Sequence, residues 1–155
     1  MIHLKRILVP TDFSKTSEIA IDYARALAEA FDASVQFIYV VEEPYVHGWS
    51  GLGYIPDVPQ FRETLRKNAQ ERLDKLLTSP ERARFRAETF VKFGNPFVEI
   101  VRHAREAATD LIVMGTHGRG PVGHMLLGSV AEKVVRKAPC PVLSVRHPEH
   151  EFVKP

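Results

Sequence analysis

A glycine-containing segment, Gly115-Thr-His-Gly118-Arg-Gly-Pro-Val-Gly-His-Met-Leu-Leu-Gly128-Ser129, is the part of the sequence best suited to chemistry. It follows the apolar run Leu111-Ile-Val-Met114, which is typical of a buried strand, and it leads into a helical pattern. Glycines let backbone N–H groups approach an anion, and a helix N-terminus adds unpaired donors. The segment therefore predicts a phosphate-binding loop. Its Gly-x2-Gly-x9-Gly-Ser spacing is neither the Walker pattern nor the dinucleotide fingerprint.

Four segments, found in the family's order, resemble the universal stress protein family and specifically its ATP-binding branch, and the resemblance covers nearly the whole chain. The glycine loop resembles the nucleotide loop of the family. The other three segments are Ile7-Leu-Val-Pro-Thr-Asp-Phe-Ser14, Gln36-Phe-Ile-Tyr-Val-Val-Glu42 and Cys140-Pro-Val-Leu-Ser-Val145, which resemble its first, second and last strands. The resemblance implies a single α/β domain that forms dimers. It also implies a regulator or sensor in stress response that binds ATP.

The ends of the predicted strands supply the residues expected to meet the ribose and the base. The first strand ends at Pro10, Thr11 and Asp12. Asp12 is expected to accept a hydrogen bond from a ribose hydroxyl or to hold a metal through water. The alternative role for Asp12 is helix capping, but Ser14 is already available as the cap. The backbone at Val40 is expected to offer its N–H and C=O to the adenine edge. Met114 is expected to pack against the base or ribose, or to fill the core.

The glycine loop supplies the residues expected around the triphosphate, which are Gly115, Gly118, Gly128, Ser129 and Val130. The hydroxyl of Ser129 and the N–H groups of Ser129 and Val130 would act as donors. Arg119 is the fixed cation of this loop and can contact a β- or γ-phosphate, although a solvated arginine is nearly as good an interpretation. His117 flanks the loop and is a further predicted nucleotide contact, as a hydrogen-bonding or exposed histidine. It lacks metal-ligand spacing, so Mg²⁺ would arrive mainly with the phosphates.

Two other functions stay open beside a nucleotide-binding regulator. Slow ATP hydrolysis is one, because Asp12 and Arg119 are available, but the sequence has no paired carboxylates or catalytic-loop pattern. A protein-interaction module of the same fold without nucleotide is the other, and the glycine and serine spacing argues against it. A flavin or aminoacyl-adenylate site is more remote, because no His-x-Gly-His signature is present.

The elements that must position these residues alternate between strand and helix. Strands are expected at residues 4–9, 34–41, 85–92, 110–114 and 142–145. Helices are expected after the caps Ser14 and Asn95, at the apolar repeat that runs from Phe61 to Leu77, and at a capping box formed by Ser129 and Glu132. This alternation predicts one doubly wound domain. It would contain a five-stranded parallel sheet of order 3-2-1-4-5, with helices on both faces.

Domain boundaries and location follow from length and composition. The chain has 155 residues, 45% of them hydrophobic, and a formal net charge of +2. We expect one domain over residues 1–146 with a tail over 147–155, in the cytoplasm, with no nucleic-acid or membrane partner. The single cysteine excludes an internal disulfide. The irregular segment from Glu42 to Pro59 has no assigned role.

The last strand, Val142 to Val145, is expected to lie at a sheet edge without a lysine or proline inside it. Unpaired backbone groups at such an edge invite another chain. The sequence therefore predicts a homodimer paired through this strand, which would also bury Leu143 and Val145.

Overall fold

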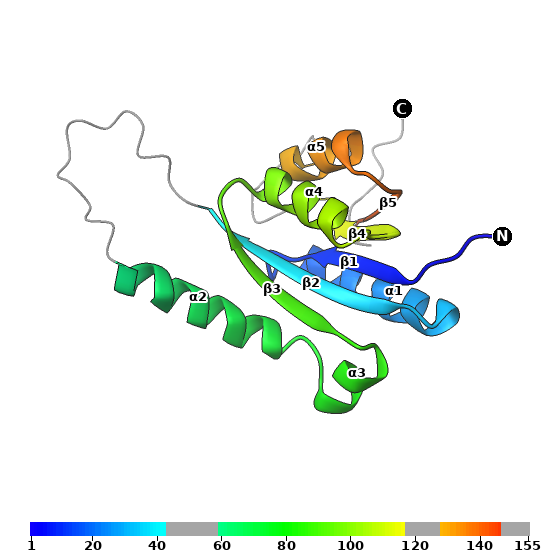
Figure 1. Ribbon diagram of the computed structural model, residues 1–155, viewed down its shortest axis with the longest axis horizontal. Coiled ribbons are helices and arrows are strands. Elements are labelled where there is room, and N and C mark those ends of the chain that lie inside the picture. Colours follow the sequence, from blue (N-terminus) through cyan, green and yellow to red (C-terminus); the bar gives the residue numbers. More distant parts are fainter. Residues whose placement is uncertain (43–58, 117–127, 147–155) are drawn as a thin grey trace.

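The sheet places β1 at its centre. The computed structural model describes residues 1–42, 59–116 and 128–146. Within them, five parallel strands lie in the order β3-β2-β1-β4-β5, which confirms the predicted order (Figure 1). The strands are β1 (Arg6–Pro10), β2 (Ser34–Val41), β3 (Glu88–Phe93), β4 (Leu111–Gly115) and β5 (Val142–Val145). The strand predicted at 85–92 begins three residues later because Phe85 caps the C-terminus of a preceding helix.

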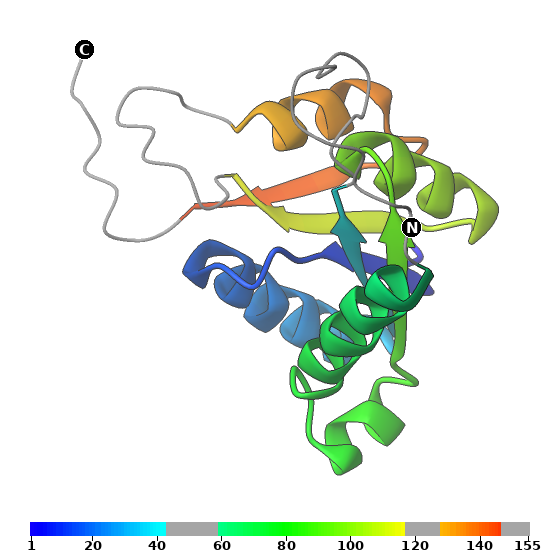
Figure 2. The ribbon, with the colours of Figure 1, turned by 90° about the vertical axis from the view of Figure 1, so that its left-hand side faces the viewer.

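Helices cover both faces of the sheet. They are α1 (Lys15–Phe31), α2 (Pro59–Asp74), α3 (Ser79–Arg84), α4 (Pro96–Glu106) and α5 (Ser129–Lys137). Figure 2 shows α1 and α2 on one side of the strands and α4 and α5 on the other. The sequence analysis did not predict α3. None of the helices in the described ranges is long and apolar enough to cross a membrane.

The central strand is buried on both faces, because its apolar residues alternate between two clusters. Ile7 and Val9 pack with α1 and α2, whereas Leu8 packs with α4 and α5. An unbroken apolar run is typical of a parallel strand covered on both sides. Burying each such side chain contributes about 1.5–3 kcal/mol. β1 therefore anchors both layers of the molecule.

The first helix begins as predicted, and its buried face is a narrow stripe. Ser14 is the N-cap, and its Oγ accepts the Ser17 N–H at 3.3 Å. Along the rest of the helix the buried residues are three alanines and Ile21. Tyr23 and Phe31 lie outside this stripe and are 52% and 42% exposed. Small buried residues let the helix axis lie close to the strands.

The expected capping box at the last helix is wrong. Gly128 is the N-cap, Ser129 is the first helical residue, and no side chain caps this end. Glu132 N–H donates to the carbonyl of Gly128 at 2.9 Å, so Glu132 closes the first turn instead of reaching back to a serine cap. A capping box forms at α3, between Thr78 and Glu81. At α4 the predicted positions hold, although Asn95 caps without a side-chain bond before Pro96.

A buried polar cluster lies between β2, β3 and α4. The Nε2 of His103 lies 3.2 Å from the amide oxygen of Gln36, and the amide nitrogen of Gln36 donates to Glu88 at 2.9 Å. The ring of Phe90 packs against the His103 ring with centroids 4.4 Å apart. Burial lowers the pKa of His103 below its usual 6.5, Lys92 lowers this pKa further, and Glu88 partly opposes the shift. His103 is therefore held in its neutral form.

This cluster predicts a loss of stability on acidification. Because the folded state binds the His103 proton more weakly than the unfolded state, the free energy of unfolding should fall as the pH drops below about 6.5, by up to about 1.4 kcal/mol per pH unit. His103→Gln should remove this component while keeping a partner for Gln36. Urea unfolding at several pH values measures it. His3→Gln, at an exposed position, is the control, and equal pH slopes in wild type and His103→Gln would contradict the prediction.

Candidate functional site

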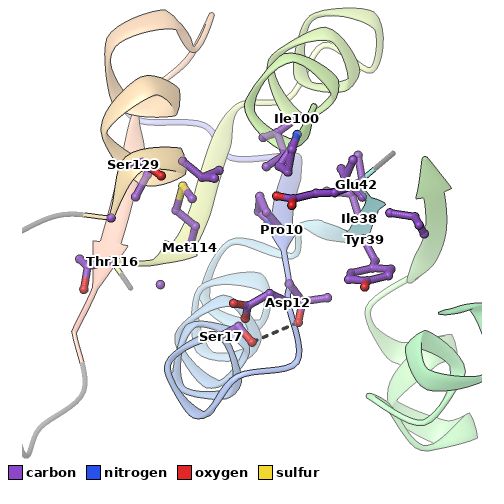
Figure 3. Close-up of a pocket in the computed structure, with 18 residues that line it drawn as sticks. Pro10, Asp12, Ser17, Ile38, Tyr39, Glu42, Ile100, Met114, Thr116 and Ser129 are labelled. Atoms are coloured by element: carbon purple, nitrogen blue, oxygen red, sulfur yellow. Dashed lines mark hydrogen bonds between the residues drawn. The ribbon is translucent and has the colours of Figure 1, made fainter. Parts of the chain in front are cut away.

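A cavity of about 640 Å³ lies at the carboxyl ends of β1, β2 and β4 (Figure 3). The chain continues from β1 to α1 on one face of the sheet and from β4 to α5 on the other face, and parallel sheets place ligands at such a reversal. The cavity brings together most of the residues predicted for the site, namely Pro10, Thr11, Asp12, Val40, Met114, Gly115, Gly128, Ser129 and Val130. The predicted contacts His117, Gly118 and Arg119 lie outside the described residues, as do residues 43–58 of the irregular segment.

The loop after β1 is held in one conformation by its own polar side chains. Thr11 Oγ1 donates to Ser17 Oγ at 3.1 Å and accepts the Phe13 N–H at 3.0 Å. One carboxylate oxygen of Asp12 accepts the Ser14 N–H at 3.0 Å, and none of the hydrogen bonds among the described residues uses the other oxygen. Asp12 thus braces the loop and lines the cavity, while Ser14 performs the capping.

An aromatic stack fixes the same loop. Phe13 has a φ of 61°, which is unusual for a bulky residue and costs about 1–3 kcal/mol. Its ring packs against Tyr39 with centroids 4.8 Å apart, and the guanidinium of Arg72 lies 3.9 Å from its centroid. Contacts from β2 and α2 therefore compensate the strain at Phe13. The sequence analysis missed this stack, because nothing local links these three positions.

The end of β2 presents backbone polar groups to the cavity. The carbonyl of Ile38 accepts a hydrogen bond from the Thr11 N–H, so the backbone polar groups of Ile38 point toward β1. Because these groups alternate along a strand, those of Val40 point the same way. The carbonyl of Val41 points toward β3 and accepts the Gly94 N–H. β1 ends at Pro10, opposite Ile38. Across the described ranges, the N–H and C=O of Val40 therefore have no strand partner. The Val40 side chain is buried between the sheet and α4.

The N-terminus of α5 forms the opposite wall of the cavity. Because the first intrahelical bond is donated by Glu132, the N–H groups of Ser129, Val130 and Ala131 have no helical acceptor. These three residues line the cavity. Gly128 is tied to the sheet, since its N–H donates to the carbonyl of Thr116 at 2.5 Å. This arrangement offers backbone donors and a positive dipole end to an anion.

The charges of the wall are acidic. Among the lining residues that the structure describes, the charged side chains are Asp12 and Glu42, and none is basic. An anionic ligand must therefore be neutralised by backbone donors, by residues outside the described part, or by a bound cation. The lining residues that sequence reasoning missed are Ser17, Ile38, Tyr39, Val41, Glu42, Pro96, Ile100, Thr116 and Ala131. Strand alternation from Val40 could have identified Glu42, and the Gly94-Asn95-Pro96 boundary could have placed Pro96 at this edge.

Comparison with known proteins decides the family. The model of the universal stress protein family matches residues 3–146. The chain belongs to the universal stress protein family. The universal stress protein MJ0531 of Methanocaldococcus jannaschii is 40% identical over 148 residues, covering 95% of this chain and 85% of that protein.

Solved structures of the same family share the fold. The structure of the MJ0577 protein superposes with a TM-score of 0.78 at 30% identity, covering 96% of this chain and 99% of that one. MJ0577 is a universal stress protein of Methanocaldococcus jannaschii. A universal stress protein solved in complex with cAMP has a TM-score of 0.58 at 25% identity, covering 93% of this chain and 98% of that one.

In this universal stress protein, Gly115 has a packing role in addition to its place in the cavity wall. A Cβ at Gly115 would lie 2.8 Å from the Cγ2 of Thr16 and 3.2 Å from the Thr16 backbone carbon. The end of β4 can therefore lie against the first turn of α1 only without a side chain at this position. Sequence reasoning assigned Gly115 to phosphate contact alone, because a helix packed across the strand is not visible in a local motif.

We predict that Gly115→Ala destabilises this universal stress protein by about 1–3 kcal/mol, because the added methyl overpacks the contact with α1. Thr16→Ser removes the Cγ2 that the methyl meets first, so the double variant should regain part of the loss. Urea denaturation of the four proteins in a double-mutant cycle measures the coupling. If the losses of stability in the two single variants simply add in the double variant, the contact with Thr16 does not cause the destabilisation by Gly115→Ala.

Proposed function

We propose that this protein binds ATP with Mg²⁺ and acts as a nucleotide-dependent regulator or sensor in stress response. The observation that carries the proposal is the pairing of two sets of backbone groups across one cavity. The N–H and C=O of Val40 have no strand partner in the described ranges, and the N–H groups at the start of α5 have no helical acceptor. The first pair suits a base and the second suits phosphates. The relative solved with cAMP supports an adenine nucleotide as the ligand.

The backbone of Val40 favours adenine over guanine. One edge of adenine presents the N1 acceptor beside the donor hydrogens of the 6-amino group, which complements a backbone N–H beside a C=O. Guanine presents a donor at N1 and an acceptor at O6, so the same backbone pair would meet donor with donor and acceptor with acceptor. Buried polar groups left unpaired in this way cost about 1–3 kcal/mol each. ATP should therefore bind more tightly than GTP.

The phosphates would lie against α5, with the cation between them and the acidic wall. The N–H groups of Ser129, Val130 and Ala131 would donate to phosphate oxygens. Asp12 would accept a hydrogen bond from a ribose hydroxyl or hold Mg²⁺ through water. A cation at this place agrees with a wall that contains carboxylates and no described basic side chain. His117, Gly118 and Arg119 are proposed as further contacts on the sequence pattern. The domain over 1–146, the tail over 147–155 and a cytoplasmic location are likewise proposals from the sequence.

We predict that Ser129→Pro weakens ATP binding about 10-fold or more, because it removes one backbone N–H that would donate a hydrogen bond to a charged phosphate oxygen. Proline is favoured at the first helical position, and Gly128 before it has a compatible ψ of 154°. Ser129→Ala is the matched control, since it removes the hydroxyl and keeps the N–H. Calorimetric titration with ATP and excess Mg²⁺ measures both. Equal affinity of the two variants would exclude this N–H as a donor, and a wild-type protein that binds no nucleotide would favour the interaction-module alternative.

We also propose a homodimer paired through β5. This strand is at the edge of the sheet, as predicted. The carbonyl of Pro141 accepts the Ile112 N–H, and the carbonyl of Val145 accepts the Thr116 N–H, so these carbonyls face β4. The backbone groups of the alternate residues, Val142 and Ser144, therefore point to the free edge. Val145 is already buried within one chain at 6% exposure, so a dimer is not needed to cover it. The backbone of Ser144 is the better probe.

Ser144→Pro should shift the protein from dimer toward monomer, because it removes an outward N–H and leaves the pairing with β4 intact. Ser144→Ala keeps that N–H and should remain dimeric. Sedimentation velocity at micromolar concentration distinguishes the two states, with circular dichroism to verify folding. A wild-type monomer, or a dimer that Ser144→Pro does not affect, would exclude assembly through this edge.

A further inference from the structure

Glu42 is a charged residue of the cavity wall without a structural role among the described residues. It follows the end of β2 and, by strand alternation, shares the face of Ile38 and Val40. Figure 3 shows its side chain reaching from this strand end across the cavity toward Pro10 of β1. In the part of the chain that the structure describes, no hydrogen bond or ion pair holds this carboxylate. Glu42 is exposed to solvent, and its position beside the N–H and C=O of Val40 places a charged acceptor at the wall of the cavity.

We propose that Glu42 is a specificity residue that selects a purine with a 6-amino group. This inference rests on the proposed function and names a side chain that would read the base. The 6-amino group has two N–H bonds, and the C=O of Val40 can accept only one of them. A carboxylate two residues further along the same face accepts the second, and the hydrogen bond is strengthened by the charge.

The same carboxylate disfavours a 6-oxo purine. An ionised carboxylate has acceptors and no donor. Opposite a 6-oxo group it would place one acceptor against another, with no hydrogen between them. Discrimination of this kind arises when a site built for a hydrogen bond meets an analogue that lacks the matching group. Val40 and Glu42 would thus discriminate in the same direction, the first through its backbone and the second through its side chain.

The test compares ATP with ITP, which replaces the 6-amino group by an oxo group and keeps the same ribose and triphosphate. Wild-type protein with excess Mg²⁺ should bind ATP at least about 10-fold more tightly than ITP. Glu42→Gln should reduce this ratio at least about fivefold, mainly by tightening ITP, because the glutamine amide can donate to the oxo group. Removing a negative charge can tighten any triphosphate, so the ratio of the two affinities is the readout. Glu71→Gln on α2, which lies outside this cavity wall, controls for net charge.

The outcomes separate this inference from the proposed function. A wild-type protein that binds ATP and ITP equally, or a Glu42→Gln variant that keeps the wild-type ratio, overturns the role of Glu42 and leaves nucleotide binding intact. A wild-type protein that binds neither nucleotide overturns both. If the preference for ATP over ITP falls in Glu42→Gln and not in Glu71→Gln, Glu42 recognises the 6-amino group. Thermal melts verify that each variant is folded.

Discussion

The parallel pairing of β1 with β2 on one side and β4 on the other is the constraint on which the rest of the structure depends. Both hydrophobic clusters include residues of β1, so the two helical layers are joined through this strand. The register that sets Pro10 opposite Ile38 also decides where pairing stops. β2 continues to Val41 after β1 has ended, and the cavity opens in that difference of length. The cavity is therefore a product of strand pairing.

The backbone adds hydrogen-bonding groups to this cavity beside its polar side chains. Val40 contributes an N–H and a C=O, the start of α5 contributes three N–H groups, and the charged side chains described in the wall are Asp12 and Glu42. Backbone donors at a helix terminus are fixed by the helix and need no flexible side chain to be ordered. The conformation of the Asp12 loop, by contrast, depends on distant packing, because Tyr39 and Arg72 hold Phe13. The two sides of the cavity are thus built on different physical principles.

The sheet order and half of the described cavity wall could be predicted because they follow from local patterns. Apolar runs that end in Pro10 or Gly115 mark strands, and parallel strands place those ends together. Long-range contacts decide what the sequence did not reveal. Thr116 holds Gly128 and so moves the helix cap away from Ser129. Likewise Arg72 reaches Phe13 from another element. No periodicity encodes such contacts, although strand alternation from Val40 could have identified Glu42.

The unpaired backbone at Val40 has a consequence for the tolerance of this chain to mutation. Because N–H and C=O are common to every residue except proline, exchange of Val40 for another apolar residue of similar volume leaves these two groups where they are. What must be preserved is the point at which β1 stops. If pairing ran on past Thr11, the sheet itself would take up the Val40 groups and the cavity would lose them. The constraint thus falls on the length of the neighbouring strand, which ends at Pro10, and residue identity at position 40 carries little of it.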